Sequence, residues 1–198
     1  KTKIMTQKEF IELSEEEEVA SGIDYYWVAD DVGTIFEFAD YFFDFNTVLK
    51  CYELDISKES VNIQEVIEDA IEHVNLILED RQGTIGKHFV AERTTVLLNE
   101  VHFINVIVNI LENAIKYSPN IPKIDIFTEN VKEYIVIKIK DNGIGMSKIA
   151  QKRVFEKFYR EHTGDVHDVK GHGLGLAYVK KIIDDHNGQI YVESEKGK

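Results

Sequence analysis

The positions of hydrophobic residues predict helices and strands in alternation after residue 51. From 61 to 82, apolar residues recur three and four positions apart, which is the period of an amphipathic helix. The predicted apolar face comprises Ile63, Val66, Ile67, Ala70, Ile71, Val74 and Ile77. A second helix is predicted over 100–117. It ends before Ser118-Pro119, because a residue that precedes proline avoids the helical region.

Apolar and polar residues alternate between these helices, which is typical of strands. The predicted strands are 52–57, 84–90, 94–99, 121–130 and 133–140. The last two are expected to form a hairpin-like pair. A third helix, amphipathic, is predicted after Leu176.

Residues 1–50 differ from the rest of the chain in charge. They hold twelve acidic residues and four lysines, a balance of −8, whereas the whole chain has a formal net charge of −13. The run Glu15–Glu18 is typical of a solvated helix face or a flexible spacer. Apolar residues return at helical spacing from Val32 to Leu49, so we expect a mainly helical acidic segment whose role the sequence does not reveal.

Composition narrows the classes of protein that fit the sequence. The 198 residues suit one domain, or one domain with a smaller appendage, and 43% hydrophobic residues are enough for a packed core. The negative charge argues against a nucleic-acid-binding protein, which needs a basic surface. The single cysteine, Cys51, excludes an internal disulfide and fits a reducing compartment. No apolar run approaches the length of a membrane span.

One face of the helix predicted over 100–117 carries polar side chains. They are Asn109, Glu112, Asn113 and Lys116, spaced three and four residues apart on an otherwise apolar helix. An amide oxygen can bind a hard cation such as Mg²⁺, whose remaining ligands are water and phosphate oxygens, and the lysine adds positive charge for phosphates. A polar stripe that faces solvent explains this pattern equally well.

A carboxylate and two glycines follow the strand predicted over 133–140. Asp141, at the end of that strand, can lie at the bottom of a pocket and accept a hydrogen bond from an exocyclic amine such as that of adenine. Gly143 and Gly145 would let the base lie against the backbone. Taken alone, however, Asp-Asn-Gly is a common turn sequence.

The segment VFEKFYR, residues 154–160, combines aromatic and basic residues. Its aromatic residues are Phe155, Phe158 and Tyr159. They could hold a mobile segment against the domain, while Arg160 reaches phosphate oxygens with its planar guanidinium group. The polar loop 161–170 follows, so we interpret 147–170 as a lid.

Three histidines, His162, His167 and His172, fall in or beside this lid. They suggest a metal site, but no acid or cysteine at suitable spacing supports one. Solvated loop histidines are therefore the better interpretation.

Glycines occupy alternate positions in GHGLGL, immediately before the third predicted helix. The six residues are Gly171, His172, Gly173, Leu174, Gly175 and Leu176. Glycine lets the backbone approach a ligand closely, and the free N–H groups at the start of a helix attract an anion. The pattern is typical of a phosphate-binding loop, although a glycine-rich turn before an ordinary amphipathic helix would have the same sequence pattern.

Together and in this order, the four motifs resemble the ATP-binding catalytic domain of bacterial sensor histidine kinases, within the superfamily shared with gyrase, Hsp90 and MutL. NILENAIKYSP resembles the family's asparagine box and DNGIGM its first glycine box, while VFEKFYR resembles its phenylalanine box and GHGLGL its second glycine box. The resemblance covers 51–198. It implies an α+β fold, a two-layer α/β sandwich in which three helices cover one face of a mixed, mainly antiparallel sheet.

The resemblance also implies ATP and Mg²⁺ as cofactors and a role for individual residues. Asn113 would be the principal Mg²⁺ ligand, with Asn109 assisting, and Asp141 would bind the adenine amine. The implied catalytic residues are Asn109, Glu112, Asn113, Lys116 and Arg160. The implied nucleotide-binding residues are Asn113, Lys116, Tyr117, Asp141, Gly143, Ile144, Gly145, Phe158, Tyr159, Arg160, Gly171, His172, Gly173, Leu174, Gly175 and Leu176.

Two features bear on the reaction that the resemblance implies. ATP-hydrolysing relatives such as gyrase carry a glutamate where this chain has Asn109, and an amide cannot act as a general base. Phosphoryl transfer to a histidine is therefore expected in preference to hydrolysis. The family carries its acceptor histidine on a dimerising helical hairpin ahead of this domain, but no histidine precedes His73. The acceptor would then come from another domain or chain.

The sequence departs from the family's pattern in three further places. The family's domain ends with a glycine turn and a further strand, whereas this sequence stops at Lys198, so we expect the sheet to lack its last strand. His186-Asn187-Gly188 replaces His-Gly-Gly, and His172 stands where threonine or serine is common. Neither replacement is expected to prevent nucleotide binding.

The resemblance therefore implies a histidine protein kinase catalytic domain that is inactive without its acceptor domain. The implied partners are ATP or ADP, the acceptor-histidine dimerisation domain and a response regulator. The full-length protein would be a homodimer, and this domain the cytoplasmic part of a membrane-anchored bacterial sensor. Two alternatives stay open: a nucleotide-binding regulatory or interaction fragment without turnover, and a serine kinase of the anti-sigma type.

Overall fold

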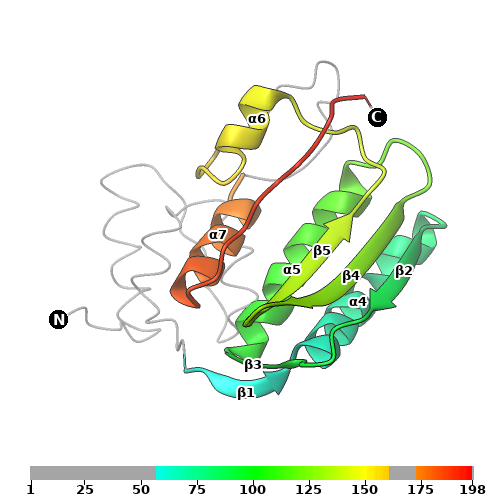
Figure 1. Ribbon diagram of the computed structural model, residues 1–198. Helices are drawn as coiled ribbons and strands as arrows, with labels where there is room; N and C mark the ends of the chain where they lie inside the picture. Colours follow the sequence, from blue (N-terminus) through cyan, green and yellow to red (C-terminus); the bar gives the residue numbers. More distant parts are fainter. Residues whose placement is uncertain (1–56, 161–172, 198) are drawn as a thin grey trace, which may run out of the picture. The chain divides into compact units, whose positions relative to one another are not determined.

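The computed structural model describes residues 57–160 and 173–197, which belong to the unit Ile56–Lys198 (Figure 1). Its elements are β1 (Glu59–Asn62), α4 (Ile63–Asp80), β2 (Thr84–Phe89), β3 (Thr95–Leu98), α5 (Glu100–Lys116), β4 (Lys123–Val131), β5 (Tyr134–Lys140), α6 (Lys148–Arg153) and α7 (Gly175–Asp185). The helical acidic segment predicted over 1–50 lies outside the described residues. So does the strand predicted over 52–57, except for Ser57, which is in a loop.

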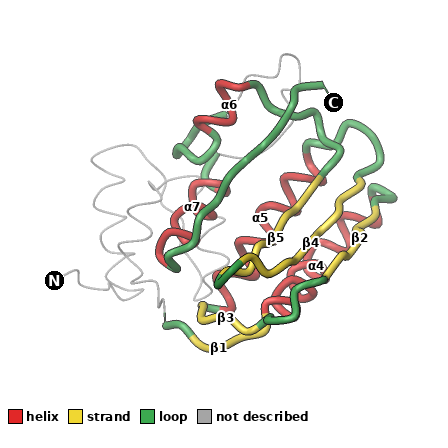
Figure 2. Tube along the Cα trace, viewed as in Figure 1, coloured by secondary structure: helices red, strands yellow, loops and turns green. Residues whose placement is uncertain are grey.

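The strands of the described part form two sheets (Figure 2). β1 and β3 pair antiparallel, with Ser60 opposite Leu97. The larger sheet has the order β2-β4-β5, in which β2 is parallel to β4 and β4 is antiparallel to β5. Figure 1 shows α4 and α5 side by side behind this sheet, and α7 packs against α5. The predicted α+β sandwich with a mixed sheet is thereby confirmed, and so is the pairing of the two long strands.

Helix α4 begins two residues later than its apolar period predicts. Val61 and Asn62 pair with β3 as the end of β1, and the Asn62 side chain then accepts a hydrogen bond from the Gln64 N–H as the N-cap. The prediction was also wrong for Ile77, which is 45% exposed, whereas Leu78 is buried. The buried face continues from Val74 to Leu78 in a step of four residues, which leaves Ile77 off to one side.

Helix α5 follows its predicted bounds closely. The Asn99 side chain accepts a hydrogen bond from the His102 N–H as the N-cap, with Glu100 in the first turn and Lys116 in the last. These charges oppose the partial charges of the helix ends, which stabilises the helix. The apolar face of α5, including Val106 and Leu111, is buried. Its polar face therefore points away from the apolar core.

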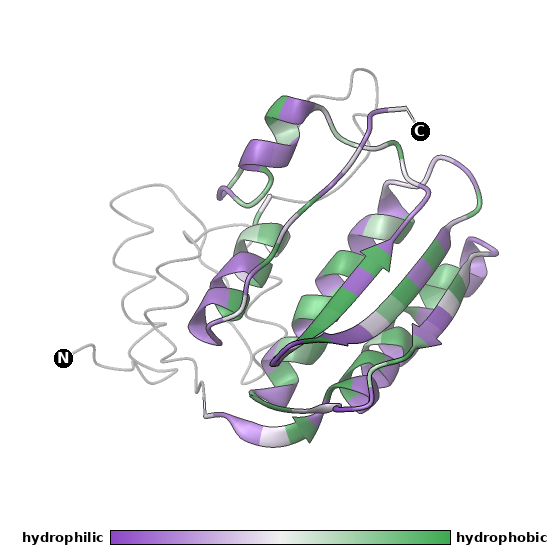
Figure 3. Cartoon of the chain, viewed as in Figure 1, coloured by the Kyte–Doolittle hydropathy of each residue, from purple (hydrophilic) through white to green (hydrophobic). Residues whose placement is uncertain are grey.

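The core lies between the helices and β4. Ile124, Ile126 and Thr128 are at most 1% exposed, while the alternating residues Lys123 and Glu129 are exposed. Figure 3 shows this alternation of hydrophobic and hydrophilic positions along β4 and β5. Burying one such isoleucine contributes about 1.5–3 kcal/mol, so this layer holds the domain together.

Two polar contacts anchor the end of α7. The His186 Nε2 accepts a hydrogen bond from the Asn99 N–H at 3.0 Å, and its Nδ1 lies 2.7 Å from the Ile182 carbonyl oxygen. The Lys58 ammonium donates to the Asp185 carbonyl at 2.7 Å. The bond from Asn99 holds the carboxyl end of α7 against the start of α5, and the bond from Lys58 ties it to the segment before β1. Among the described helices, none is long and apolar enough to span a membrane.

Candidate functional site

The polar face predicted on α5 is present, with side chains at different depths. Asn109, Asn113 and Lys116 are half-buried, whereas Glu112 is exposed. The Lys116 ammonium lies 5.6 Å from the centroid of the Tyr117 ring, which is within the range of a cation–π interaction. Within the part of the chain that the structure describes, the Asn113 side-chain amide has no hydrogen-bond partner. Its oxygen is therefore available to a ligand.

Asn109 is held in a defined orientation. Its Nδ2 donates to the Asn105 carbonyl oxygen at 2.8 Å. A carbonyl oxygen only accepts, so the amide nitrogen must face it and the Asn109 Oδ1 must face away. This oxygen faces α7, since a Cβ added to Gly175 would lie 2.5 Å from it.

Glu112 lies on the same helix as these amides, and the pKa of its carboxyl group is raised. Although the side chain as a whole is exposed, partial desolvation of the carboxyl group raises its pKa, and the positive charge of Lys116, four residues on, opposes that rise. The group therefore holds its proton more tightly than a solvated glutamate does.

The loop after β5 is fastened to the end of α5. The Asp141 Oδ1 accepts a hydrogen bond from the Gly143 N–H at 2.8 Å, and the Ile144 N–H donates to the Tyr117 carbonyl at 3.0 Å. Gly143 is buried, and a Cβ there would lie 3.1 Å from the Tyr117 carbonyl oxygen. The asparagine box and the first glycine box are thus brought together, with the Asp141 side chain exposed between them.

A residue that the sequence analysis passed over stabilises this loop. Asn142 accepts hydrogen bonds from the Lys123 N–H at 2.9 Å and the Ser118 hydroxyl at 3.2 Å, and it donates to the Ile121 carbonyl at 3.1 Å. The Asp-Asn-Gly sequence indicates a turn at Asn142. It does not identify the hydrogen-bond partners of Asn142, because they lie about twenty residues away in sequence.

The second glycine of that loop lies against the last residues of the chain. Gly145 has a φ of +67°, and a Cβ there would lie 2.2 Å from the Glu195 carbonyl oxygen. The Gly197 N–H donates to the Ile144 carbonyl at 2.9 Å, and the Met146 N–H donates to the Ser194 hydroxyl at 2.8 Å. A side chain at residue 145 would separate these segments, which explains the glycine.

The phenylalanine box meets the second glycine box at Gly173. The Phe158 N–H donates to the Gly173 carbonyl at 3.0 Å. Gly173 has a φ of +74°, and a Cβ there would lie 2.9 Å from both the Phe158 carbonyl carbon and the Tyr159 oxygen. Because these neighbours are backbone atoms, only glycine fits.

The aromatic residues of the phenylalanine box differ in burial. Phe155 and Tyr159 are half-buried, whereas Phe158 is 56% exposed. Phe158 was predicted to help hold its segment against the domain, but in the described part of the chain its side chain is exposed instead.

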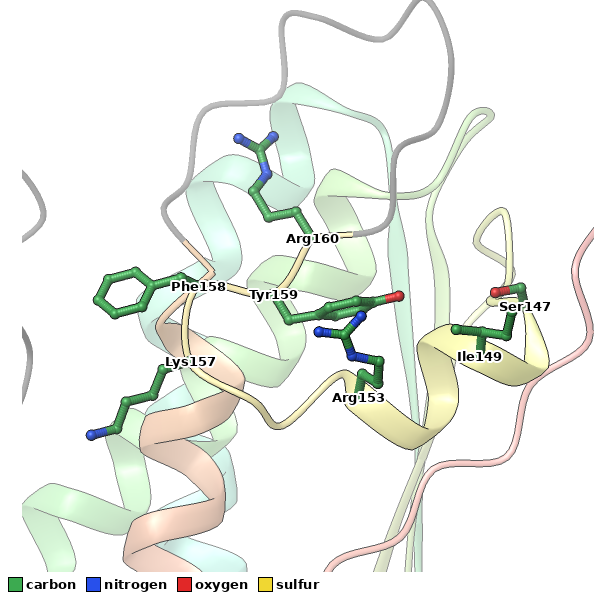
Figure 4. A pocket seen from close by; sticks show the side chains of 7 residues that line it. All are labelled: Ser147, Ile149, Arg153, Lys157, Phe158, Tyr159 and Arg160. Atoms are coloured by element: carbon green, nitrogen blue, oxygen red, sulfur yellow. The ribbon is translucent and has the colours of Figure 1, made fainter.

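A pocket of about 470 Å³ lies between α6 and the phenylalanine box (Figure 4). It is lined by Ser147, Ile149, Arg153, Lys157, Phe158, Tyr159 and Arg160. Figure 4 shows Arg153 beside the Tyr159 ring, 4.5 Å from its centroid, while Lys157 and Arg160 extend in different directions. The cationic lining suits an anion, but the two extended side chains do not converge on one point.

The remaining residues of the second glycine box form the start of α7. Leu174 is buried, and Gly175 and Leu176 are half-buried. No side chain caps this helix end in the described residues, so the first N–H groups of α7 are free to bind an anion. Gly171 and His172 lie outside the described residues, as do His162 and His167. The described residues contain no group of three or more metal-ligating side chains among histidine, cysteine, aspartate and glutamate.

We use the term glycine contacts for the close approaches that other parts of the chain make to Gly143, Gly145, Gly173 and Gly175. They join the asparagine box to both glycine boxes, and the second glycine box to the phenylalanine box. The described contacts do not join Asp141 to the phenylalanine box directly.

Comparison with known proteins gives consistent matches. The family described as "Histidine kinase-, DNA gyrase B-, and HSP90-like ATPase" matches residues 98–198. Sensor protein RprX of Bacteroides fragilis is 45% identical over 151 residues, which is 74% of this chain and 27% of RprX. Phytochrome-like protein Cph1 of Synechocystis is 34% identical over 137 residues, 69% of this chain and 18% of that protein. The chain therefore spans about a quarter or less of these relatives.

A solved structure shares the fold. The mycobacterial sensor histidine kinase MprB superposes with a TM-score of 0.58 at 27% sequence identity, covering 69% of this chain and 85% of that one.

Proposed function

Because the chain belongs to the histidine kinase-, DNA gyrase B- and HSP90-like ATPases and contains the ATP-binding catalytic domain of a sensor histidine kinase, we propose that it binds Mg²⁺-ATP beside the α5–α7 contact and transfers the γ-phosphoryl group to a histidine. The approach of Gly175 to Asn109 carries this proposal. It sets the uncapped N-terminus of α7 beside the amide face of α5, so that anion-binding and cation-binding groups are neighbours.

The donor groups on α5 fit a magnesium ion. The Asn113 amide is unpaired among the described residues, and the Asn109 oxygen is turned away from its own helix. Neutral amide oxygens suit a hard cation that keeps water and phosphate oxygens as its other ligands. Asn113 and Asn109 would hold Mg²⁺, which would neutralise charge on the phosphates when bound.

The remaining groups would bind the nucleotide. The N–H groups at the start of α7, Lys116 and Arg160 would contact phosphate oxygens. Asp141 would accept a hydrogen bond from the adenine amine. Its Oδ1 already accepts one from the Gly143 N–H, and its second carboxylate oxygen would accept the one from adenine. Tyr117, with Lys116 over its ring, would line the base pocket.

Transfer is favoured over hydrolysis because Asn109 cannot remove a proton from water. Phosphoryl transfer relies on positioning and charge neutralisation, which the residues above can supply. The acceptor histidine would come from a dimerisation domain in another part of the protein or in another chain.

A wider context follows from the two-component relatives. The complete protein would be a homodimer anchored in the membrane, and it would pass the phosphoryl group to a response regulator. The division into an acidic segment, 1–50, and a catalytic domain, 51–198, is part of this proposal.

Phosphoryl transfer can be measured with ATP labelled in the γ-phosphate. The chain is incubated with Mg²⁺ and a dimerisation domain from a sensor kinase relative, beside the Asn113→Ala variant. We expect acid-labile label on the acceptor domain with the unchanged chain and none with the variant. Acid-stable label would indicate a serine kinase, and release of inorganic phosphate without label would indicate hydrolysis. Nucleotide binding with neither product would favour a regulatory module.

A further inference from the structure

A buried polar cluster lies between α5 and α7, away from the residues assigned above. Tyr178 of α7 is 5% exposed, and its hydroxyl oxygen lies 2.9 Å from the Nδ1 of His102, which is 8% exposed. The same hydroxyl group is hydrogen-bonded to the Asn105 side chain. Burial raises the pKa of Tyr178, so the hydroxyl stays protonated and can donate.

The cluster continues to the proposed metal site. His102, Asn105 and Asn109 are spaced three and four residues apart, so they share one face of α5. The Asn105 backbone carbonyl accepts the Asn109 Nδ2 at 2.8 Å. Asn105 therefore bonds to Tyr178 through its side chain, and it fixes the direction of the Asn109 oxygen through its backbone carbonyl.

Helix α7 thus touches the polar face of α5 at two points. Gly175 meets the Asn109 oxygen, and Tyr178, one turn later, meets Asn105 and His102. Two contacts one turn apart fix both the rotation of α7 about its axis and its position along α5. Without the contact at Tyr178, the polar contacts of α7 with α5 would be those at Gly175 and, at the far end of α7, the hydrogen bond from the Asn99 N–H to His186, so the start of α7 would be held less firmly.

We propose that Tyr178 is a positioning residue for Asn109. It holds the start of α7 and the Asn109 oxygen at the separation that a magnesium-bound phosphate requires. The other buried residues of α7, Ala177, Val179 and Ile182, are apolar, and apolar packing alone allows neighbouring helices to slide more freely than directional hydrogen bonds do. This inference rests on the proposed function, because it assigns Asn109 a role in metal binding.

The test is calorimetric titration of the chain with ADP, with and without Mg²⁺. The Tyr178→Phe variant keeps the ring and removes the hydroxyl. We expect its dissociation constant for ADP to rise roughly three- to tenfold with Mg²⁺, the range for loss of one or two hydrogen bonds. The constant without Mg²⁺ should rise less, because Asn109 contributes only when the metal is bound. A merely structural role would lower the midpoint of thermal unfolding and shift both constants together or neither.

Two further variants sharpen the test. Tyr191→Phe removes an exposed hydroxyl that bonds to the Gln189 side chain, and it should change neither constant. In an Asn109→Ala background, Tyr178→Phe should have no further effect on the Mg²⁺-dependent constant, because residues that act through one another are not additive. An equal fold-change in both backgrounds would overturn the inference.

The outcomes separate this inference from the proposed function. If the unchanged chain binds ADP equally well with and without Mg²⁺, the proposed metal site is wrong and the inference falls with it. If Mg²⁺ strengthens binding in the unchanged chain and equally in Tyr178→Phe, only the inference is wrong.

Discussion

Two regions of the molecule pack in opposite ways: the apolar layer between β4 and the helices, and the glycine contacts beside that layer. In the layer, side chains such as Ile126 and Leu111 are completely buried and fill the available space. At the glycine contacts, the space is filled by backbone atoms or, at Gly175, by the Asn109 side-chain oxygen, and a single added carbon at Gly173 or Gly175 would overlap a neighbour. The layer depends on side chains that are present, whereas the glycine contacts depend on side chains that are absent. Stability and binding are therefore expected to respond to different mutations.

The largest effect is expected in the apolar layer. Ile126→Ala should lower the free energy of unfolding by about 2–5 kcal/mol, because it removes buried atoms and leaves a cavity. Nucleotide affinity, measured where the variant is still folded, should stay unchanged. Chemical denaturation measures the loss. Ile149→Ala removes the same atoms at a site that is 69% exposed, and an equal loss of stability there would contradict the location of the core.

The next effect is expected at a glycine contact. Gly173→Ala should weaken ADP binding about tenfold or more, because the added carbon has to displace backbone and separates the phenylalanine box from α7. The left-handed backbone itself costs an alanine about 1–2 kcal/mol. Gly197→Ala is the matched control, since Gly197 also has a positive φ, +85°, but has open space around its Cα. Equal loss of affinity in both variants would mean that strain, and not close approach, explains the effect.

A smaller effect should appear inside the apolar layer with the opposite sign. The Thr128 hydroxyl is completely buried and has no hydrogen-bond partner in the described residues. Thr128→Val should therefore stabilise the domain by about 1 kcal/mol, because it removes an unpaired polar group with little change in volume. Thermal and chemical unfolding measure the gain. A destabilised variant would show that the hydroxyl has a partner.

The smallest effect concerns Glu112. Burial raises the pKa of its carboxyl group above the ordinary value of 4.5. The folded state then binds the proton more tightly than the unfolded state, so this group lowers stability as the pH rises through 4.5 and beyond. Glu112→Gln lacks that loss and should be the more stable protein at neutral pH, by less than about 1 kcal/mol for so exposed a side chain. A stability difference that does not change between acid and neutral pH would contradict the shift.

The two regions also differ in how well the sequence predicts them. The layer follows largely from local periods: five of the seven residues predicted for the apolar face of α4 are buried. The errors arise where tertiary pairing decides. Val61 and Asn62 fall within the helix predicted from sequence, but they pair with β3 instead of joining α4, and Ile77 lies just outside the buried face of its helix.

The motifs of the site were found by their residue types and order, but the contacts between them were not. Gly145 lies against Glu195, and Asn142, after β5, bonds to Lys123 at the start of β4. The His102–Tyr178 bond joins positions that are 76 residues apart. A single sequence carries no period that connects such distant positions. These contacts can therefore be identified only from the packed structure.

The most direct test of the account is a calorimetric titration with ADP and a non-hydrolysable ATP analogue, with and without Mg²⁺. The unchanged chain should bind one nucleotide, more tightly with Mg²⁺, and Asn113→Ala should lose the Mg²⁺-dependent gain. This result would establish that α5 and the glycine contacts form a magnesium-dependent nucleotide site. Affinity that is the same with and without Mg²⁺ in both proteins, or no binding at all, would contradict it.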